Sequence, residues 1–256
     1  MEEQDLGINT SLEGKRELLR RMLEEKNRAS RVGQTFPLSY AQRRLWFLYR
    51  MYPQSTAYNV PWVKRLRGPL DVTALERAFS QILKRHEALR TTFREEAGEA
   101  VQVVGPVPSF SLIPIQAAGD TAEERRANLM QLCSDAIERP FDLAKGPLFR
   151  ASLFRESEQE HVLLLDMHHI VTDGWSLGIL LGEMSALYNA YRRGQTPQLP
   201  DPAIQYGDFA LWQKEHLNDA ALEEQRRYWR QKLKNTAPLG FETDHPRPRL
   251  AAFDGD

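Results

Sequence analysis

Apolar residues recur at helical spacing in several stretches of the chain. In residues 39–51, Ser39 and Gln42 are placed to form a capping box in front of an apolar face. In residues 71–86, Asp71 is suited to N-cap a helix whose apolar positions run as far as His86, which we interpret as a core histidine. Similar patterns predict further helices at about 121–137, 176–193, 206–217 and 219–234.

Residues 161–167, HVLLLDM, carry the clearest strand pattern. They are almost continuously apolar, as expected for a strand buried on both faces. Other strands are predicted at 148–154, 60–66, 92–94 and 101–104. Because helices and strands alternate without a boundary, the pattern predicts one α/β unit, a layered α+β sandwich with a mostly β-sheet core covered by helices.

The N-terminal segment has a different character. Thr10 and Glu13 form a capping box before a highly charged helix with a narrow apolar stripe. We interpret residues 1–33 as an appended linker or docking helix, and residues 34–256 as the main unit. Two alternatives stay open for the helix: it lies solvated on the unit, or it docks to a neighbouring module.

The composition excludes several classes of function. The 256 residues include 34 basic and 35 acidic side chains, a net charge of −1, which gives no electrostatic reason to expect nucleic acid or a membrane surface as partner. No apolar run is long enough to span a membrane, and the N-terminus lacks a signal-peptide pattern, so we expect a cytoplasmic protein. The single cysteine, Cys133, lies in an amphipathic pattern and is interpreted as a small buried apolar residue rather than a nucleophile.

The candidate chemistry lies where the strand at 161–167 ends. His168 and His169 follow it, and Asp173 and Gly174 lead into the next helix. Groups at the carboxyl end of a core strand tend to face a crevice, and a histidine with an ordinary pKa of about 6.5 is suited to proton transfer there. Gly174 is expected to allow a tight turn, and the free N–H groups of the helix start are suited to hold an oxyanion.

The paired histidines allow two other interpretations. One is a buried histidine beside an exposed one, with no chemical role. The other is a zinc site, since His168, His169 and Asp173 are acceptable zinc ligand types. Neighbouring side chains on an extended backbone point to opposite sides, and no further ligand cluster is evident, so we expect no metal.

Longer motifs accompany the two histidines. HHIVTDG matches the pattern HHxxxDG, SYAQRRLWFL is similar to SxAQxRLWxL, RHEALRTTF to RHExLRTxF, and QYGDFALWQ to YxDFAxW. These segments occupy residues 168–174, 39–48, 85–93 and 205–213. Their order and spacing across 34–256 resemble the condensation domain of non-ribosomal peptide synthetases, in the chloramphenicol-acetyltransferase-like superfamily. The resemblance implies a lobe of that fold.

The resemblance also implies roles for individual residues. His169 is expected to face the reaction channel, while His168 and Asp173 shape the loop. Asp173 is expected to be buried in an ion pair with an arginine, for which Arg85 and Arg90 are the candidates, or else to await an arginine of the absent lobe.

The implied reaction is amide formation. The amine of an acceptor aminoacyl thioester attacks a donor acyl thioester, and both substrates ride on the 4'-phosphopantetheine arms of carrier proteins. His169 acts either as a general base or as a positioner of the amine, and Gly174 N–H helps to hold the oxyanion. No cofactor is expected to bind the domain itself, and an upstream component of the synthetase is a further candidate partner through residues 1–33.

The chain departs from the family pattern after its fourth motif. Condensation domains have two lobes with a tunnel between them, and the later motifs are absent here. We therefore expect residues 34–256 to be the N-terminal lobe, without the C-terminal lobe and inactive alone. Two alternatives remain: a non-catalytic module that binds a carrier protein or another synthetase chain, and an epimerisation domain, although those typically continue HHxxxDGVSWR where this chain has DGWSLGIL.

Overall fold

The computed structural model describes residues 31–217, 219–237, 240 and 244. The predicted N-terminal helix falls within residues 1–30 and so lies outside the described residues. In the described part of the chain, no helix is long and apolar enough to cross a membrane.

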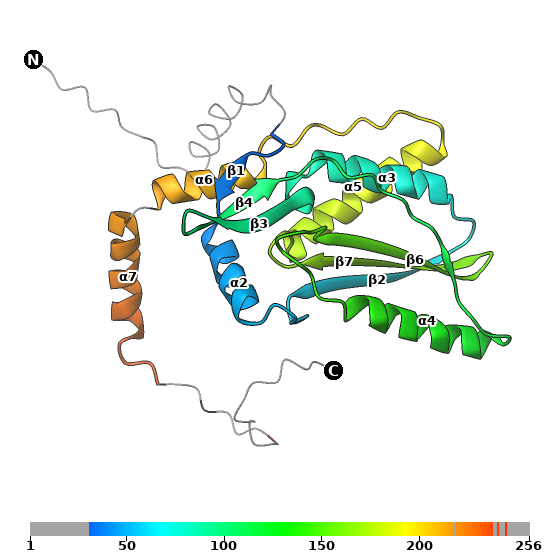
Figure 1. Cartoon of the computed structure of the whole chain (residues 1–256), viewed down its shortest axis with the longest axis horizontal. Helices are drawn as coiled ribbons and strands as arrows, with labels where there is room; N and C mark the ends of the chain where they lie inside the picture. The colour runs from blue at the N-terminus through cyan, green and yellow to red at the C-terminus, as the bar shows by residue number, and fades with distance from the viewer. Residues whose placement is uncertain (1–30, 218, 238–239, 241–243, 245–256) are drawn as a thin grey trace, which may run out of the picture.

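The strands form two sheets rather than a single central one (Figure 1). The four-stranded sheet has the order β2-β7-β6-β5, with bounds Asn59–Arg67, Glu160–His168, Phe149–Ser157 and Ile115–Gln116. The three-stranded sheet has the order β1-β4-β3, with bounds Thr35–Pro37, Glu99–Val104 and Thr91–Glu96. Within this second sheet, β3 and β4 pair through the tight turn at Ala97 and Gly98, both of which have positive φ. The layered α/β architecture is confirmed.

Helices cover both faces of the four-stranded sheet. The helices α3 (Val72–Arg85) and α5 (Gly174–Arg192) pack on one face, and α4 (Ala122–Ile137) packs on the other (Figure 1). Alternate side chains of β7 therefore enter two different cores, with Leu163 and Leu165 on the α3 and α5 side and Leu164 on the α4 side. This explains why β7 is apolar throughout although it runs antiparallel to both neighbours.

The helix starts are the ones that the capping residues predict. Ser39 Oγ accepts the Gln42 N–H (3.2 Å) while Ser39 N–H donates to Gln42 Oε1 (3.0 Å), which starts α2 (Tyr40–Met51). Asp71 Oδ1 accepts the Ala74 N–H (2.8 Å) at the start of α3. The predicted helices at 206–217 and 219–234 are α6 (Tyr206–His216) and α7 (Asp219–Leu233), and the 3-10 turn η1 spans Glu87–Arg90.

A smaller core joins the two sheets to α2. Its buried side chains are Leu38, Phe93, Phe141, Leu143, Leu148 and Ile170. Because Ile170 lies in the loop that follows β7, this core fixes the loop that carries the candidate chemistry. Cys133 packs against the core under α4, as predicted, but it is half-buried rather than fully buried, and burial raises the pKa of its thiol.

Candidate active site

The end of β7 sends its two histidines to opposite sides. His168 is the last residue of the strand and only 5% exposed, whereas His169 is exposed. The His169 N–H donates to the Tyr58 carbonyl (2.8 Å), which ties the loop to the residue before β2. This is the alternation expected of an extended backbone. Within the described residues, no group of three or more His, Cys, Asp or Glu side chains is arranged to hold a metal ion.

His168 supports the loop from inside the core. Its Nδ1 accepts the N–H of Ile170 (3.1 Å), and its ring lies near the rings of Tyr58 and Phe141, at centroid distances of 6.4 and 6.1 Å. Burial, helped by the nearby His169, lowers the pKa of His168 to about 4. His168 is therefore neutral near pH 7, with its hydrogen on Nε2, and it does not line the pocket that His169 faces.

His169 lines a pocket of about 490 Å³ at the exit of β7, as predicted. One wall comes from α2, through Ala41 and Leu45, and another from the segment that leads into α6, through Gln205 and Tyr206. The hydroxyl groups of Tyr206 and Ser39 are hydrogen-bonded (2.9 Å), so the two walls are tied to each other. Burial raises the pKa of the Tyr206 phenol, which stays protonated near pH 7.

Asp173 is an exposed N-cap and not a buried ion-pair partner. Its Oδ1 accepts the Ser176 N–H (2.8 Å) and also the Ser176 hydroxyl, and the Asp173 N–H donates back to Ser176 Oγ (2.8 Å). The hydrogen bonds from the Ser176 hydroxyl and N–H lower the pKa of Asp173 despite some desolvation. The expectation of a tight turn at Gly174 is also wrong: Gly174 is the first residue of α5, has no positive φ, and an added Cβ would meet no atom within 4 Å.

The predicted arginine partners are bound elsewhere. Arg85 pairs with Glu183, with Nε 3.1 Å from Oε2 and Nη2 3.2 Å from Oε1. Arg90 Nη2 lies 3.7 Å from Glu87 Oε1. The prediction that Asp173 pairs with Arg85 or Arg90 is therefore wrong. The last turn of α3 faces the middle of α5, where Glu183 lies ten residues beyond Asp173, about 15 Å along the helix axis.

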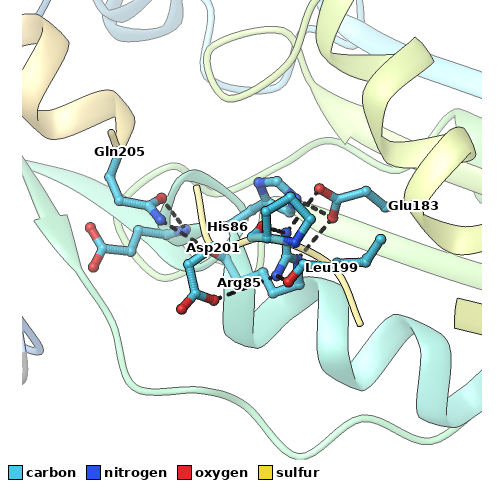
Figure 2. Close-up of polar contacts among 8 residues, drawn as sticks. Arg85, His86, Glu183, Leu199, Asp201 and Gln205 are labelled. Atoms are coloured by element: carbon cyan, nitrogen blue, oxygen red, sulfur yellow. Dashed lines mark hydrogen bonds and ion pairs between the residues drawn. The ribbon is translucent and has the colours of Figure 1, made fainter. Parts of the chain in front are cut away.

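His86 is a pocket residue, although the periodicity predicts a place in the core. It is the C-cap that follows α3, its side chain is 25% exposed, and it lines the same pocket as His169. Its Nε2 lies 2.8 Å from Glu183 Oε2, and Figure 2 shows His86 and Arg85 converging on that carboxylate. In the sequence, the charged residues Arg85 and Glu87 on either side of His86 indicate that the apolar face of the helix ends before His86.

The family profile of the condensation domain matches residues 32–256. The chain belongs to the condensation domain family. Each of the four motifs noted in the sequence adds at least one residue to the pocket of this condensation domain, among them Leu45, His86, His169 and Tyr206. Residues up to about 160 positions apart in the sequence thus surround one cavity.

Among its relatives are two large synthases. This condensation domain is 47% identical over 221 residues to chondramide synthase cmdD of Chondromyces crocatus, and the match covers 86% of this chain and 6% of that protein. It is 42% identical over 222 residues to malpinin synthetase of Mortierella alpina, covering 86% of this chain and 3% of that protein. The chain therefore spans a small part of each of these proteins.

A solved structure shows the same fold. The complex of the X-domain and OxyB from teicoplanin biosynthesis matches with a TM-score of 0.73 and 30% identity, over 87% of this chain and 48% of that one. The chain thus spans about half the length of that structure, and the predicted fold class, a condensation-domain lobe with sheets covered by helices, is confirmed.

Proposed function

We propose that this condensation domain forms an amide bond between two carrier-bound thioesters, and that His169 contacts the attacking amine. One observation carries the proposal: four sequence-distant motifs meet around a single pocket in which the His169 imidazole is exposed. Within the described residues no side chain hydrogen-bonds that imidazole, so it is available to a substrate amine. A histidine so placed is suited to accept or direct a proton.

The start of α5 is suited to hold the oxyanion that forms when an amine attacks a thioester. Its first-turn N–H groups point toward the β7–α5 loop, and Asp173 and Ser176 line the pocket. Asp173 occupies the Ser176 N–H, whereas none of the described residues accepts a hydrogen bond from the Gly174 N–H. The open space beside the Gly174 Cα leaves room for a substrate oxygen to approach that N–H.

We further propose that residues 34–256 act as one lobe, with residues 1–33 as a linker. The solved X-domain structure is about twice as long as the part that this chain matches, so a second lobe would complete the walls of the pocket. Two phosphopantetheine arms would then deliver donor and acceptor into one enclosed space. Holding both reactants there supplies much of the rate enhancement.

A binding module without catalysis is the second candidate. The observation that favours it is the relative that is solved in complex with another protein, OxyB. In this alternative, the lobe recruits a carrier protein or another synthetase chain, and the histidine motif only maintains the loop.

Single-turnover peptide formation separates the two functions. A complete condensation domain containing this chain is mixed with a donor carrier and an acceptor carrier, each loaded with one aminoacyl thioester, and intact-protein mass spectrometry follows the acceptor carrier. Catalysis predicts a dipeptidyl acceptor carrier and an unloaded donor carrier. Carrier binding without any dipeptide would support the binding module, and inversion of the donor stereocentre without a peptide bond would indicate an epimerisation domain.

A further inference from the structure

Amide formation at neutral pH removes two protons from the attacking nitrogen. An acceptor amine arrives as an ammonium group with three hydrogens, and the amide nitrogen keeps one. The first proton must leave before attack, because only the neutral amine has a lone pair. The second leaves during or after attack, and the departing thiolate takes up one proton. A pocket with two proton-accepting groups can remove both protons. This inference rests on the amide formation proposed above.

The pocket contains a second imidazole besides His169, that of His86. The two residues reach the pocket from different elements: His169 follows β7, and His86 follows α3. His169 has no side-chain hydrogen bond to any described residue, whereas His86 is held by Glu183 at 2.8 Å. An imidazole oriented by a carboxylate is the arrangement that general bases in enzymes commonly use.

The partners of Glu183 decide which nitrogen of His86 is free to act. Burial raises the pKa of the Glu183 carboxyl, but the hydrogen bonds from Arg85 and His86 outweigh it and leave that pKa below its ordinary value. Glu183 is therefore ionised and accepts hydrogen bonds only. His86 Nε2 must then carry the hydrogen, which leaves the lone pair on Nδ1. None of the described residues is hydrogen-bonded to Nδ1.

The carboxylate itself is held in place. Arg85, whose side chain is 7% exposed, binds both oxygens of Glu183 and donates to the Leu199 carbonyl (3.4 Å), as Figure 2 shows. It also donates to the Pro200 carbonyl (2.7 Å). Gln205 Nε2 donates to the Arg85 carbonyl (2.9 Å). The His86 ring is thus fixed on one wall of the pocket by a partly buried network that does not include His169.

We propose that His86 is a second catalytic residue, which takes the first proton from the acceptor ammonium through Nδ1, and that Glu183 positions it. The N–H bond breaks, its electrons stay on nitrogen as the lone pair, and His86 becomes an imidazolium paired with Glu183. The neutral amine attacks the donor carbonyl, the new C–N bond forms and the C–S bond breaks. The second nitrogen proton passes by way of His169 to the thiolate, and His86 returns its proton to solvent.

His86→Gln tests the proposal, with His86→Ala beside it. The glutamine Nε2 occupies nearly the position of the histidine Nε2, so it retains the hydrogen bond to Glu183 but offers no base. His216→Ala is the matched control, because His216 is exposed on α6 and does not line the pocket. All variants are made in a complete condensation domain containing this chain, and circular dichroism with thermal unfolding confirms that each one folds.

Single-turnover rates are measured with an ordinary acceptor and with an analogue whose amine is already neutral at the assay pH. With the ordinary acceptor, we expect both His86 variants to lose about 10²–10⁴-fold in rate, while the KM for the acceptor carrier and the rate of His216→Ala stay unchanged. With the neutral amine, the defect of His86→Gln should shrink to a few-fold, while that of His169→Ala persists.

Three results would overturn the inference. One is a wild-type rate in His86→Gln with the ordinary acceptor, which would make His86 a structural partner of Glu183. Another is an equal defect with both amines, and the third is no defect in His86→Ala. The proposed function fails separately, if the wild-type domain forms no peptide at all.

Discussion

A buried carboxyl two residues before His168 makes the stability of this domain depend on pH. Asp166 is 2% exposed on β7, and neither of its carboxyl oxygens has a hydrogen-bond partner among the described residues. Its nearest cation is Arg150, with Nη1 4.0 Å from Oδ2. Burial raises the pKa of Asp166 from its ordinary value of 3.8 to about 6, and Arg150 only partly opposes this.

The sign of the effect follows from the direction of the shift. The pKa of Asp166 is higher in the folded state than in the unfolded state, so the folded state binds the proton more tightly. The free energy of unfolding therefore rises as the pH falls from above 6 to below 3.8. At pH 8 the ionised carboxylate costs about 3 kcal/mol relative to its protonated form. Asp166→Asn resembles the protonated form at every pH. The variant should therefore be more stable than wild type by about 3 kcal/mol at pH 8 and about equal to it near pH 4.

Urea denaturation of wild type and variant from pH 4 to 8 measures this difference. His168 titrates over a similar range with the opposite sign, since its folded pKa is about 4 and its protonation opposes folding. Because His168 is present in both proteins, subtracting the two curves isolates Asp166. A difference that is constant with pH would refute the reasoning. A variant that is less stable at pH 8 would also refute it, and would show that the Asp166–Arg150 contact is net stabilising.

Three further changes test the fold around the site. Asp173→Ala should lower the free energy of unfolding by about 1 kcal/mol, the value of an N-cap; a loss of about 3 kcal/mol or more would instead indicate a buried ion pair. Leu165→Ala should cost about 2–5 kcal/mol, since this β7 side chain is fully buried, and a smaller loss in denaturation would contradict the burial of β7 against α3 and α5. Gly207→Ala should lower the thermal midpoint, because a Cβ there would lie 2.9 Å from carbons of the Phe36 ring; an unchanged midpoint would show that the ring can move aside.

Local interactions make much of the fold predictable. The Ser39–Gln42 box and the Asp71 cap each join residues three apart in the sequence. All the residues that such a cap needs therefore lie within one helical turn, where the sequence shows them directly. The buried β7 is equally clear, because its apolar run needs no knowledge of its neighbours. The exposure of His169 at the end of that strand follows from the same pattern.

Long-range pairing is not predictable in this way. Arg85 and Glu183 are 98 residues apart, and only the register in which α3 packs on α5 brings them together. Periodicity specifies which face of a helix is apolar, but not which turn of it meets a given turn of the next helix. For the same reason, the arginine that the resemblance implies for Asp173 cannot be placed from the sequence: Arg85 meets Glu183, ten residues beyond Asp173 along α5. The prediction for His86 is wrong because the helical spacing continues one residue past the last residue of α3.

The central claim is that His169 acts in amide formation, and single-turnover peptide formation by His169→Ala in a complete condensation domain tests it most directly. Because His169 is exposed on a loop and takes no part in the core, the variant should keep its thermal midpoint and its affinity for carrier proteins. Its rate of dipeptide formation should fall by about 10²–10⁴-fold relative to wild type. A variant that forms the dipeptide at the wild-type rate would contradict the claim.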